Sequence, residues 1–358
     1  MMDEDFDDRI EALVNEIETL KEEILKKRVK DKTFGNVVNE NPTSNEIRKN
    51  ANKPCRTLKG HFGKVYALQW SGDSQNIVSA SQGGQLIVWN AYTTNKLNAI
   101  ALKTSWVMSC SIDQVRAQLV ACGGLDNMCS IYRIGEPSNE QSQDPKSELV
   151  SELMAHDGYI SCCRFIGNKN IVTASGDSTV IHWDLDRGEI LNTFYDHTGD
   201  VMSISLHPSD PNIFVTGSID CRVKVWDTRT GQCTQTHFGH EGDINSVSFF
   251  PDGNAFGTGS EDCTCRLFDI RSHGEVKRFG GGAFPPVTSV DFSKSGRILF
   301  GGCVDNQAYG YDVLGASSSP VLNFSTNGHE KRITCLQVSP KGDGVCTGSW
   351  DSTLKIWA

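Results

Sequence analysis

Apolar residues are spaced in two different ways along the chain. Over the first thirty residues they recur at alternating steps of four and three, the a/d pattern of a coiled coil. We therefore expect a helix over 1–30 whose apolar stripe consists of Phe6, Ile10, Leu13, Ile17, Leu20 and Ile24. Because this stripe would lie in water on an isolated helix, the helix needs a partner. A separate second helix is favoured over self-dimerisation or packing on the rest of the chain, because the polar stretch 31–52 is typical of a linker.

From residue 53 onward the pattern changes to short alternating strands, for example at 65–70 and 223–226. A phrase of the form Gly-Ser-x-Asp recurs there, followed six residues after the Asp by an aromatic residue. The seven aromatic residues are Trp89, Tyr132, Trp183, Trp226, Phe268, Tyr311 and Trp357. Their spacing is that of one four-stranded propeller blade. The sequence therefore predicts an all-β, seven-bladed propeller over 53–358.

The two ends of the propeller segment predict how the ring closes. The chain stops one residue after its last aromatic, while an extra strand-like segment at 55–59 precedes the first full repeat. We expect this segment to form the outer strand of the last blade, since closure leaves no exposed sheet ends. The longest step between repeats holds an insertion at 135–145, whose composition indicates an exposed loop.

Composition narrows the function classes. A formal net charge of -10 argues against a general nucleic-acid binder. The 13 cysteines include no Cys-x-x-Cys pair, so we expect reduced thiols and no metal site. No secretory signal and no apolar run of membrane-spanning length is found. The phosphate-binding loop, the His-Glu-x-x-His zinc motif and the Gly-x-Ser-x-Gly elbow do not occur, so we expect neither an enzyme nor a cofactor.

The repeats resemble the WD-repeat family. The resemblance implies that the histidine opening a repeat bonds the turn aspartate, while the Trp and a strand Ser or Thr complete a buried network. The set is complete in His156, Asp177 and Trp183, in His197, Asp220 and Trp226, and in His329, Asp351 and Trp357. We interpret these His–Asp pairs as scaffolding rather than as catalytic dyads, because a buried polar network is tolerated only when satisfied.

Seven such repeats behind one heptad helix resemble the β subunits of heterotrimeric G proteins. The resemblance extends to Ser-Trp-Val-Met at 105–108, Ala-Cys-Gly-Gly-Leu-Asp-Asn at 121–127 and Gly-Asp-Val-Met-Ser at 199–203. It implies an obligate dimer with a γ subunit, formed through Ile10, Leu13, Ile17, Leu20 and Ile24. The dimer would hold the GDP-bound α subunit and bind effectors when a receptor triggers its release. A prenylated γ subunit would keep the cytoplasmic complex at the inner face of the plasma membrane.

Superimposing the repeats predicts a binding surface at one end of the central channel. The third residue after the opening histidine is Lys64, Tyr159, Asp200, Asp243 or Arg332, and Trp106 is the equivalent residue of the second repeat, which has no opening histidine. Aromatic residues and Met beside isolated charges are typical of an interaction hot spot. The resemblance assigns α-subunit and effector contacts to Lys64, Tyr66, Trp106, Met108, Leu125, Asn127, Tyr159, Asp200, Met202, Asp243, Asn245 and Trp350.

A second contact is implied at the side of the first blade. It would bind the amino-terminal helix of the α subunit through Leu86, Asn95 and Lys96. Gln85 and Asn90 depart here from the Lys and Asp that are usual in the family.

Two alternative functions remain. Trp-Asp-Thr-Arg at 226–229 resembles the short box of propeller receptors that bring substrates to cullin-type ubiquitin ligases, and 269–271 echoes it. Such a receptor has no need of the heptad helix. The other alternative is a homodimeric propeller scaffold without a G-protein partner.

Overall fold

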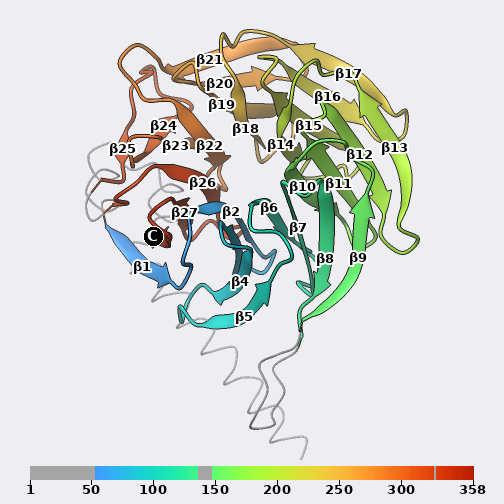
Figure 1. Cartoon of the computed structure of the whole chain (residues 1–358). Helices are drawn as coiled ribbons and strands as arrows, with labels where there is room; N and C mark the ends of the chain where they lie inside the picture. The colour runs from blue at the N-terminus through green and yellow to red at the C-terminus, as the bar shows by residue number, and fades with distance from the viewer. Residues whose placement is uncertain (1–52, 136–146, 326–327) are drawn as a thin grey trace, which may run out of the picture.

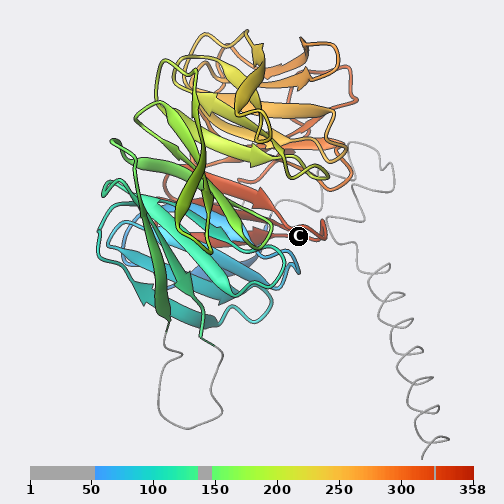
Figure 2. The same cartoon turned by 90° about the vertical axis from the view of Figure 1, so that its right-hand side faces the viewer.

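The computed structural model describes residues 53–135, 147–325 and 328–358. In these residues the chain forms seven four-stranded antiparallel sheets arranged around a central channel (Figures 1 and 2). The predicted all-β, seven-bladed propeller is confirmed. The predicted heptad helix and linker, and most of the loop predicted at 135–145, lie outside the described residues.

Each blade has four strands that follow one another from the channel outward. Blade one contains β2 (Val65–Trp70), β3 (Asn76–Ser81), β4 (Gln85–Asn90) and β5 (Lys96–Ala101). Blade two contains β6 (Val107–Ile112), β7 (Leu119–Gly124), β8 (Met128–Arg133) and β9 (Glu148–Met154). Blade three contains β10 (Ile160–Ile166), β11 (Asn170–Ser175), β12 (Thr179–Asp184) and β13 (Glu189–Tyr195).

The remaining four blades repeat this order. Blade four contains β14 (Val201–Leu206), β15 (Ile213–Ser218), β16 (Val223–Asp227) and β17 (Gln232–His237). Blade five contains β18 (Ile244–Phe249), β19 (Ala255–Ser260), β20 (Thr264–Asp269) and β21 (Gly274–Gly280). Blade six contains β22 (Val287–Phe292), β23 (Ile298–Cys303), β24 (Ala308–Asp312) and β25 (Leu322–Asn323). Blade seven contains β26 (Ile333–Val338), β27 (Val345–Ser349), β28 (Thr353–Trp357) and β1 (Pro54–Lys59).

The ring closes within blade seven. Strand β1 pairs antiparallel with β28, with Thr57 opposite Lys355. Leu58 of β1 packs in the same apolar cluster as Val65 of blade one and Leu354 of blade seven. The first and last strands of the described chain are therefore joined by a ladder of backbone hydrogen bonds and by a shared apolar core. This pairing closes the ring and leaves no free sheet edge between the first and last blades.

Small residues let neighbouring blades approach closely. A Cβ atom at Gly217 of β15 would lie 2.6 Å from Cγ2 of Ile244, the first residue of the next blade. A Cβ atom at Gly259 of β19 would likewise lie 2.6 Å from Cγ1 of Val287, the first residue of the next inner strand. The Gly of the repeated Gly-Ser phrase is therefore explained by packing between blades, because any side chain would push the inner strand of the next blade away.

The repeated histidine and aspartate belong to a buried network. In blade four, Nδ1 of His197 lies 2.8 Å from Oδ2 of Asp220, and its Nε2 lies 2.8 Å from the hydroxyl of Thr216, which also accepts from Nε1 of Trp226. Burial alone would raise the pKa of Asp220, but hydrogen bonds, first of all from His197, lower it. The same bonds join His156, Asp177 and Trp183 in blade three, and His329, Asp351 and Trp357 in blade seven.

Blade one lacks part of this network. His61 bonds the hydroxyl of Ser79 at 2.7 Å, and Trp89 donates to the same oxygen. Gly83 occupies the position of the aspartate, and Nδ1 of His61 has no hydrogen-bond partner among the described residues. Burial, together with the nearby charge of Lys96, therefore lowers the pKa of His61 to about 4.

Candidate functional site

Every inner strand carries a β-bulge at its second residue. The register with the next strand shifts between the first and third residues in all seven blades. A bulge re-aims the side chain of the unpaired residue. The bulged residues share one level of the channel mouth, and they are Tyr66, Met108, Ser161, Met202, Asn245, Thr288 and Thr334.

Four bulged residues are polar, and each of them ties its blade to the next. Asn245 donates to the carbonyl oxygen of Val287 at 2.8 Å. Thr288 donates to that of Ile333 at 2.8 Å, and Thr334 to that of Val65 at 2.6 Å. Ser161 makes the corresponding bond to Val201. These side chains hold the ring together, because each bond joins two different sheets.

The three apolar bulged residues make no such bond in the described part of the chain. Tyr66 lies between two other aromatic residues, with ring centroids 6.3 Å from those of Trp106 and Trp350. The sulfur of Met202 lies 3.5 Å from the hydroxyl of Tyr159. That hydroxyl donates to Asp200 at 2.9 Å, and burial together with this bond raises the pKa of Tyr159 to about 12. Tyr66 and Met202 therefore contact neighbouring blades through side chains at the channel mouth, and not through a bond to the backbone of the next blade.

Trp350 is the centre of a cation–π cluster. The guanidinium carbon of Arg332 lies 3.3 Å from the centroid of its ring, and Nζ of Lys64 lies 3.7 Å from it. Such contacts contribute about 0.5–2 kcal/mol each. They hold the indole of Trp350 in one orientation at the channel mouth, so this surface is preorganised for a partner.

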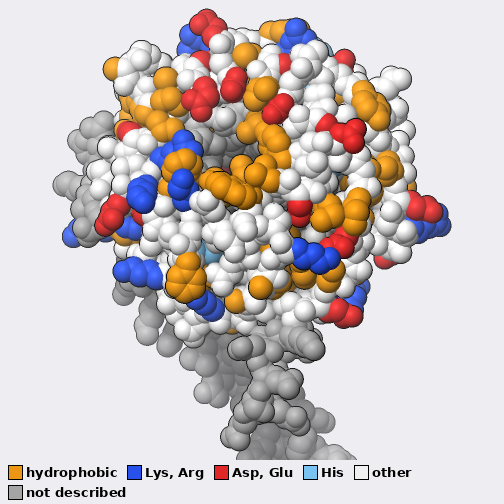
Figure 3. All heavy atoms as spheres, viewed as in Figure 1, with side chains coloured by type: hydrophobic (Ala, Val, Ile, Leu, Met, Phe, Trp, Pro, Cys, Tyr) orange, Lys and Arg blue, Asp and Glu red, His pale blue; other side chains and the backbone are white. Residues whose placement is uncertain are grey.

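Apolar side chains remain exposed beside this cluster. Trp106 is 41% exposed and Leu125 is 52% exposed. In Figure 3, hydrophobic side chains gather around the mouth of the channel, with Lys and Arg side chains on one side. We call this the rim surface, and it comprises Lys64, Tyr66, Trp106, Met108, Leu125, Asn127, Tyr159, Asp200, Met202, Asp243, Asn245, Arg332 and Trp350.

The rim surface has a basic side and an acidic side. Lys64 and Arg332 belong to blades one and seven, whereas Asp200 and Asp243 precede the inner strands of blades four and five. Glu261 lies beside the acidic side and accepts from Asn245. Asn127 holds the intervening turn of blade two, with a φ of 61° and a bond from its side chain to the carbonyl of Asp157. A partner that carries complementary charges would bind in one orientation.

Arg332 is the residue that the sequence-based site missed. It was placed at the register of Lys64 and Trp106 by the superimposed repeats, but the resemblance did not assign it a contact. Its stacking on Trp350 makes it part of the rim surface. The register was the signal that could have included it.

The predicted side contact of blade one is only partly available. Leu86 is fully buried in the cluster between blades one and two, so its prediction as a contact residue is wrong. Middle strands of a propeller are covered on both faces by neighbouring blades, which removes Leu86 from the surface. Asn95 and Lys96 are exposed, and the adjacent Leu97 is 42% exposed.

The structure adds little support for the other two candidate sites predicted from the sequence, the γ-binding stripe and the ligase-like box. The γ-binding residues Ile10, Leu13, Ile17, Leu20 and Ile24 lie outside the described residues. Arg229 of the ligase-like box lies in the turn after β16 and forms a fork with Asp227 at the end of that strand, at 2.6 Å for the closest pair. Arg271 does the same with Asp269. Both arginines are therefore already paired with an aspartate, and neither is free to bind a carboxylate of a partner protein.

The described residues contain neither a candidate metal site nor a candidate membrane-spanning helix. Within 53–135, 147–325 and 328–358, no group of three His, Cys, Asp or Glu side chains could hold a metal ion. Over the same ranges, no helix is long and apolar enough to cross a membrane.

Comparison with known proteins gives one consistent result. Residues 7–358 match the family model described as G protein beta WD-40 repeat protein. The chain is 42% identical over 316 residues to the guanine nucleotide-binding protein subunit beta of Nicotiana tabacum, a match that covers 85% of this chain and 83% of the relative. With the same coverage, identity is 46% over 316 residues to the subunit of that name from Arabidopsis thaliana and 45% over 318 residues to that from Oryza sativa subsp. japonica.

Proposed function

The chain belongs to the G protein β family of WD-40 repeat proteins, and on this premise we propose that it is the β subunit of a heterotrimeric guanine nucleotide-binding protein. Its role is that of a signalling scaffold, and nucleotide binding and hydrolysis belong to the α subunit. The observation that carries the proposal is the rim surface, where large, partly exposed apolar side chains stand at the positions that bond the backbone of the next blade elsewhere in the ring.

The rim surface binds the GDP-loaded α subunit and, after receptor activation, the effectors. Trp106, Leu125 and the Trp350 cluster supply apolar area and oriented cations, which are the usual components of an interaction hot spot. Because one surface serves both classes of partner, the α subunit and the effectors compete. Asn95 and Lys96 provide a smaller contact for the amino-terminal helix of the α subunit.

The heptad stripe of residues 1–30 pairs with a γ subunit in an obligate dimer. Its support is the alternating step of apolar residues, which fits a two-stranded coiled coil. A lipid anchor on the γ subunit places the complex at the inner face of the plasma membrane, while the β chain itself touches the membrane only through its partners.

The rim assignment is tested by Trp106→Ala in binding to a GDP-loaded α subunit. Loss of the exposed indole should weaken binding about 10- to 100-fold, the range of a central aromatic hot spot. Tyr195→Ala removes an even more exposed aromatic residue from the outer strand of blade three and should bind normally. Unchanged binding by Trp106→Ala would overturn the assignment, and capture of a cullin adaptor instead of an α subunit would favour the ligase receptor.

The dimer is tested by Ile17→Asp combined with Leu20→Asp. Two carboxylates in the apolar seam should abolish co-purification of a small helical partner. The matched control is Asn15→Asp with Thr19→Asp, which adds the same charge off the stripe. Equal recovery of the partner by both double variants would contradict the coiled coil.

A further inference from the structure

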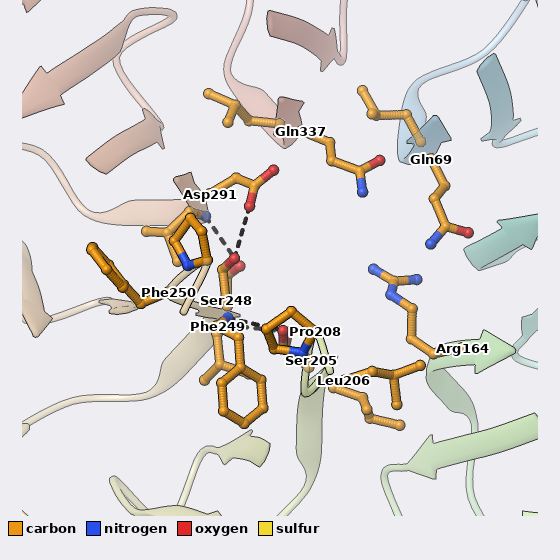
Figure 4. Close-up of a pocket in the computed structure, with 18 of the residues that line it drawn as sticks. Gln69, Arg164, Ser205, Leu206, Pro208, Ser248, Phe249, Phe250, Asp291 and Gln337 are labelled. Atoms are coloured by element: carbon orange, nitrogen blue, oxygen red, sulfur yellow. Dashed lines mark hydrogen bonds between the residues drawn. The ribbon is translucent and has the colours of Figure 1, made fainter. Parts of the chain in front are cut away.

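A cavity of about 320 Å³ lies in the channel at the far end from the rim surface. It is lined by side chains from the second half of the inner strands, and Figure 4 shows it from within the ring. Six blades contribute the fifth residue of their inner strand, namely Gln69, Arg164, Ser205, Ser248, Asp291 and Gln337. The volume falls in the range of small-molecule sites.

The amide groups of two of these residues are fixed in orientation. Oε1 of Gln69 accepts from the backbone N–H of Ile112 at 2.7 Å, and Oε1 of Gln337 accepts from that of Trp70 at 2.7 Å. Because both oxygens are taken by neighbouring blades, both NH₂ groups must face the cavity. Figure 4 shows the two nitrogens on the cavity side.

Arg164 adds a positive charge beside these donors. Its Nη1 donates to the carbonyl oxygens of Cys163 and Cys110, at 2.8 and 3.3 Å. Nε and Nη2 have no acceptor among the described residues, and the guanidinium points between Gln69 and Gln337 (Figure 4). A guanidinium stays protonated and presents donors in a fork that suits a carboxylate or a phosphate.

Asp291 lies across the cavity, but it is already satisfied. Its carboxylate accepts from the Ser248 hydroxyl at 2.7 Å and from the backbone N–H groups of Phe292 and Val338, at 3.0 and 2.8 Å. No ion pair with Arg164 forms in the described structure. The donors of Gln69, Arg164 and Gln337 converge on the cavity from blades one, three and seven.

The rest of the lining consists of four serines, Ser203, Ser205, Ser246 and Ser248, and of an apolar wall. Leu206, Pro208, Phe249 and Phe250 line the side opposite the amide groups (Figure 4). We propose that this cavity binds a small organic oxyanion, a carboxylate or a phosphate monoester, with its charged end at Arg164, Gln69 and Gln337 and its apolar body against this wall. A ligand held there bridges three blades, so it stabilises the closed ring. The site is separate from the rim surface and does not depend on the function proposed above.

The test measures binding of phenyl phosphate, benzoate and benzamide by calorimetry to the full chain with its co-purified partners. At least one of the two anions should bind, and the neutral amide should bind about tenfold more weakly or worse, because charge-assisted hydrogen bonds are lost. The stronger of phenyl phosphate and benzoate identifies the site as one for phosphates or for carboxylates. No binding of either anion, or equal binding of benzamide, would overturn the proposal.

Variants locate the binding in the cavity. Gln69→Glu keeps the oxygen that accepts from Ile112 and replaces only the donor that faces the cavity, so anion binding should fall about tenfold or more. Gln232→Glu makes the same change on the exposed outer strand of blade four and should bind as wild type does. Arg164→Lys, which retains charge but loses the fork, should also weaken binding. If Gln69→Glu and Arg164→Lys both bound the anions as wild type does, the anions would be binding adventitiously outside the cavity, and the proposed site would be overturned.

Discussion

The bulged residues of blades three, five, six and seven differ in kind from those of blades one, two and four. The first group consists of Ser161, Asn245, Thr288 and Thr334, and each bonds a backbone carbonyl of the next blade. The second group consists of Tyr66, Met108 and Met202, which lie at the same backbone position and make no such bond within the described residues.

This difference separates scaffold from function at positions that the backbone treats alike. A ring of seven blades needs some bonds between neighbouring inner strands, and four polar bulges supply them. At the other three positions the chain gives up the bond to a backbone carbonyl of the next blade and presents a large apolar group at the channel mouth. Because a polar residue would supply that bond here as well, we attribute the large apolar groups to recognition of a partner.

The largest expected effect lies wholly on the scaffold side of the comparison. Asp220→Ala removes the acceptor of His197 and of two backbone N–H groups, leaving buried donors unpaired. The free energy of unfolding should fall by about 2–4 kcal/mol in a denaturant titration. Binding of the α subunit by the folded fraction should not change. Asp186→Ala, at an exposed turn, is the control, and an equal loss there would contradict the special role of the network.

The next effect lies on the recognition side. Trp350→Ala removes the ring that orients Lys64 and Arg332. Binding of the α subunit should weaken by about 1–3 kcal/mol, measured by surface plasmon resonance at a temperature at which the variant is folded. Retention of wild-type affinity would mean that the cation–π cluster plays no part in recognition.

A smaller effect is expected at a polar bulge. Thr288→Val keeps the shape of the side chain but removes its bonds to the carbonyl oxygens of Gly302 and Ile333. The free energy of unfolding should fall by about 1 kcal/mol, with α-subunit affinity unchanged. A loss of affinity without a loss of stability would break the comparison, because it would assign recognition to a scaffold position.

The smallest effect at neutral pH is expected in blade one. The pKa of His61 in the folded chain, about 4, is below its ordinary 6.5, so protonation favours the unfolded chain. The stability that neutral His61 contributes is complete above pH 6.5 and is lost as the pH falls towards 4. His61→Gln should therefore make the unfolding free energy depend less steeply on pH over this interval. If the free energy of unfolding depended on pH in the same way in wild type and in His61→Gln, the lowered pKa of His61 would be contradicted.

Much of the fold could be predicted from the sequence, because each blade repeats the same packing problem. The aromatic spacing predicted seven blades, and Gly217 and Gly259 recur because the next blade leaves no space for a side chain. The bulges could not be predicted in this way. A bulge is a shift in the backbone hydrogen-bond register, and residues as different as Tyr66 and Thr334 occupy it.

The sequence predicted which residues of the candidate site share one level of the channel, but it did not predict which of the candidate residues are exposed to solvent. The repeat register placed Lys64, Trp106 and Arg332 at one level of the channel. Counting could not tell that Leu86 is buried, since both faces of a middle strand are covered in a propeller and alternation no longer separates core from surface. The convergence of Gln69 and Gln337 on the channel cavity also has no signature in the sequence, because it depends on which amide atom each backbone N–H engages.

The central claim is that the apolar bulges recognise a partner while the polar bulges hold the ring. It is tested most directly by measuring α-subunit affinity and the free energy of unfolding together for Tyr66→Thr and Thr334→Val. The first variant gives an apolar position the residue used in blade seven, and the second removes a bond between blades. We predict about 10- to 100-fold weaker binding without a loss of stability for Tyr66→Thr, and about 1 kcal/mol lower stability with unchanged binding for Thr334→Val. Wild-type affinity in Tyr66→Thr, or an equal loss of affinity in both variants, would contradict the account.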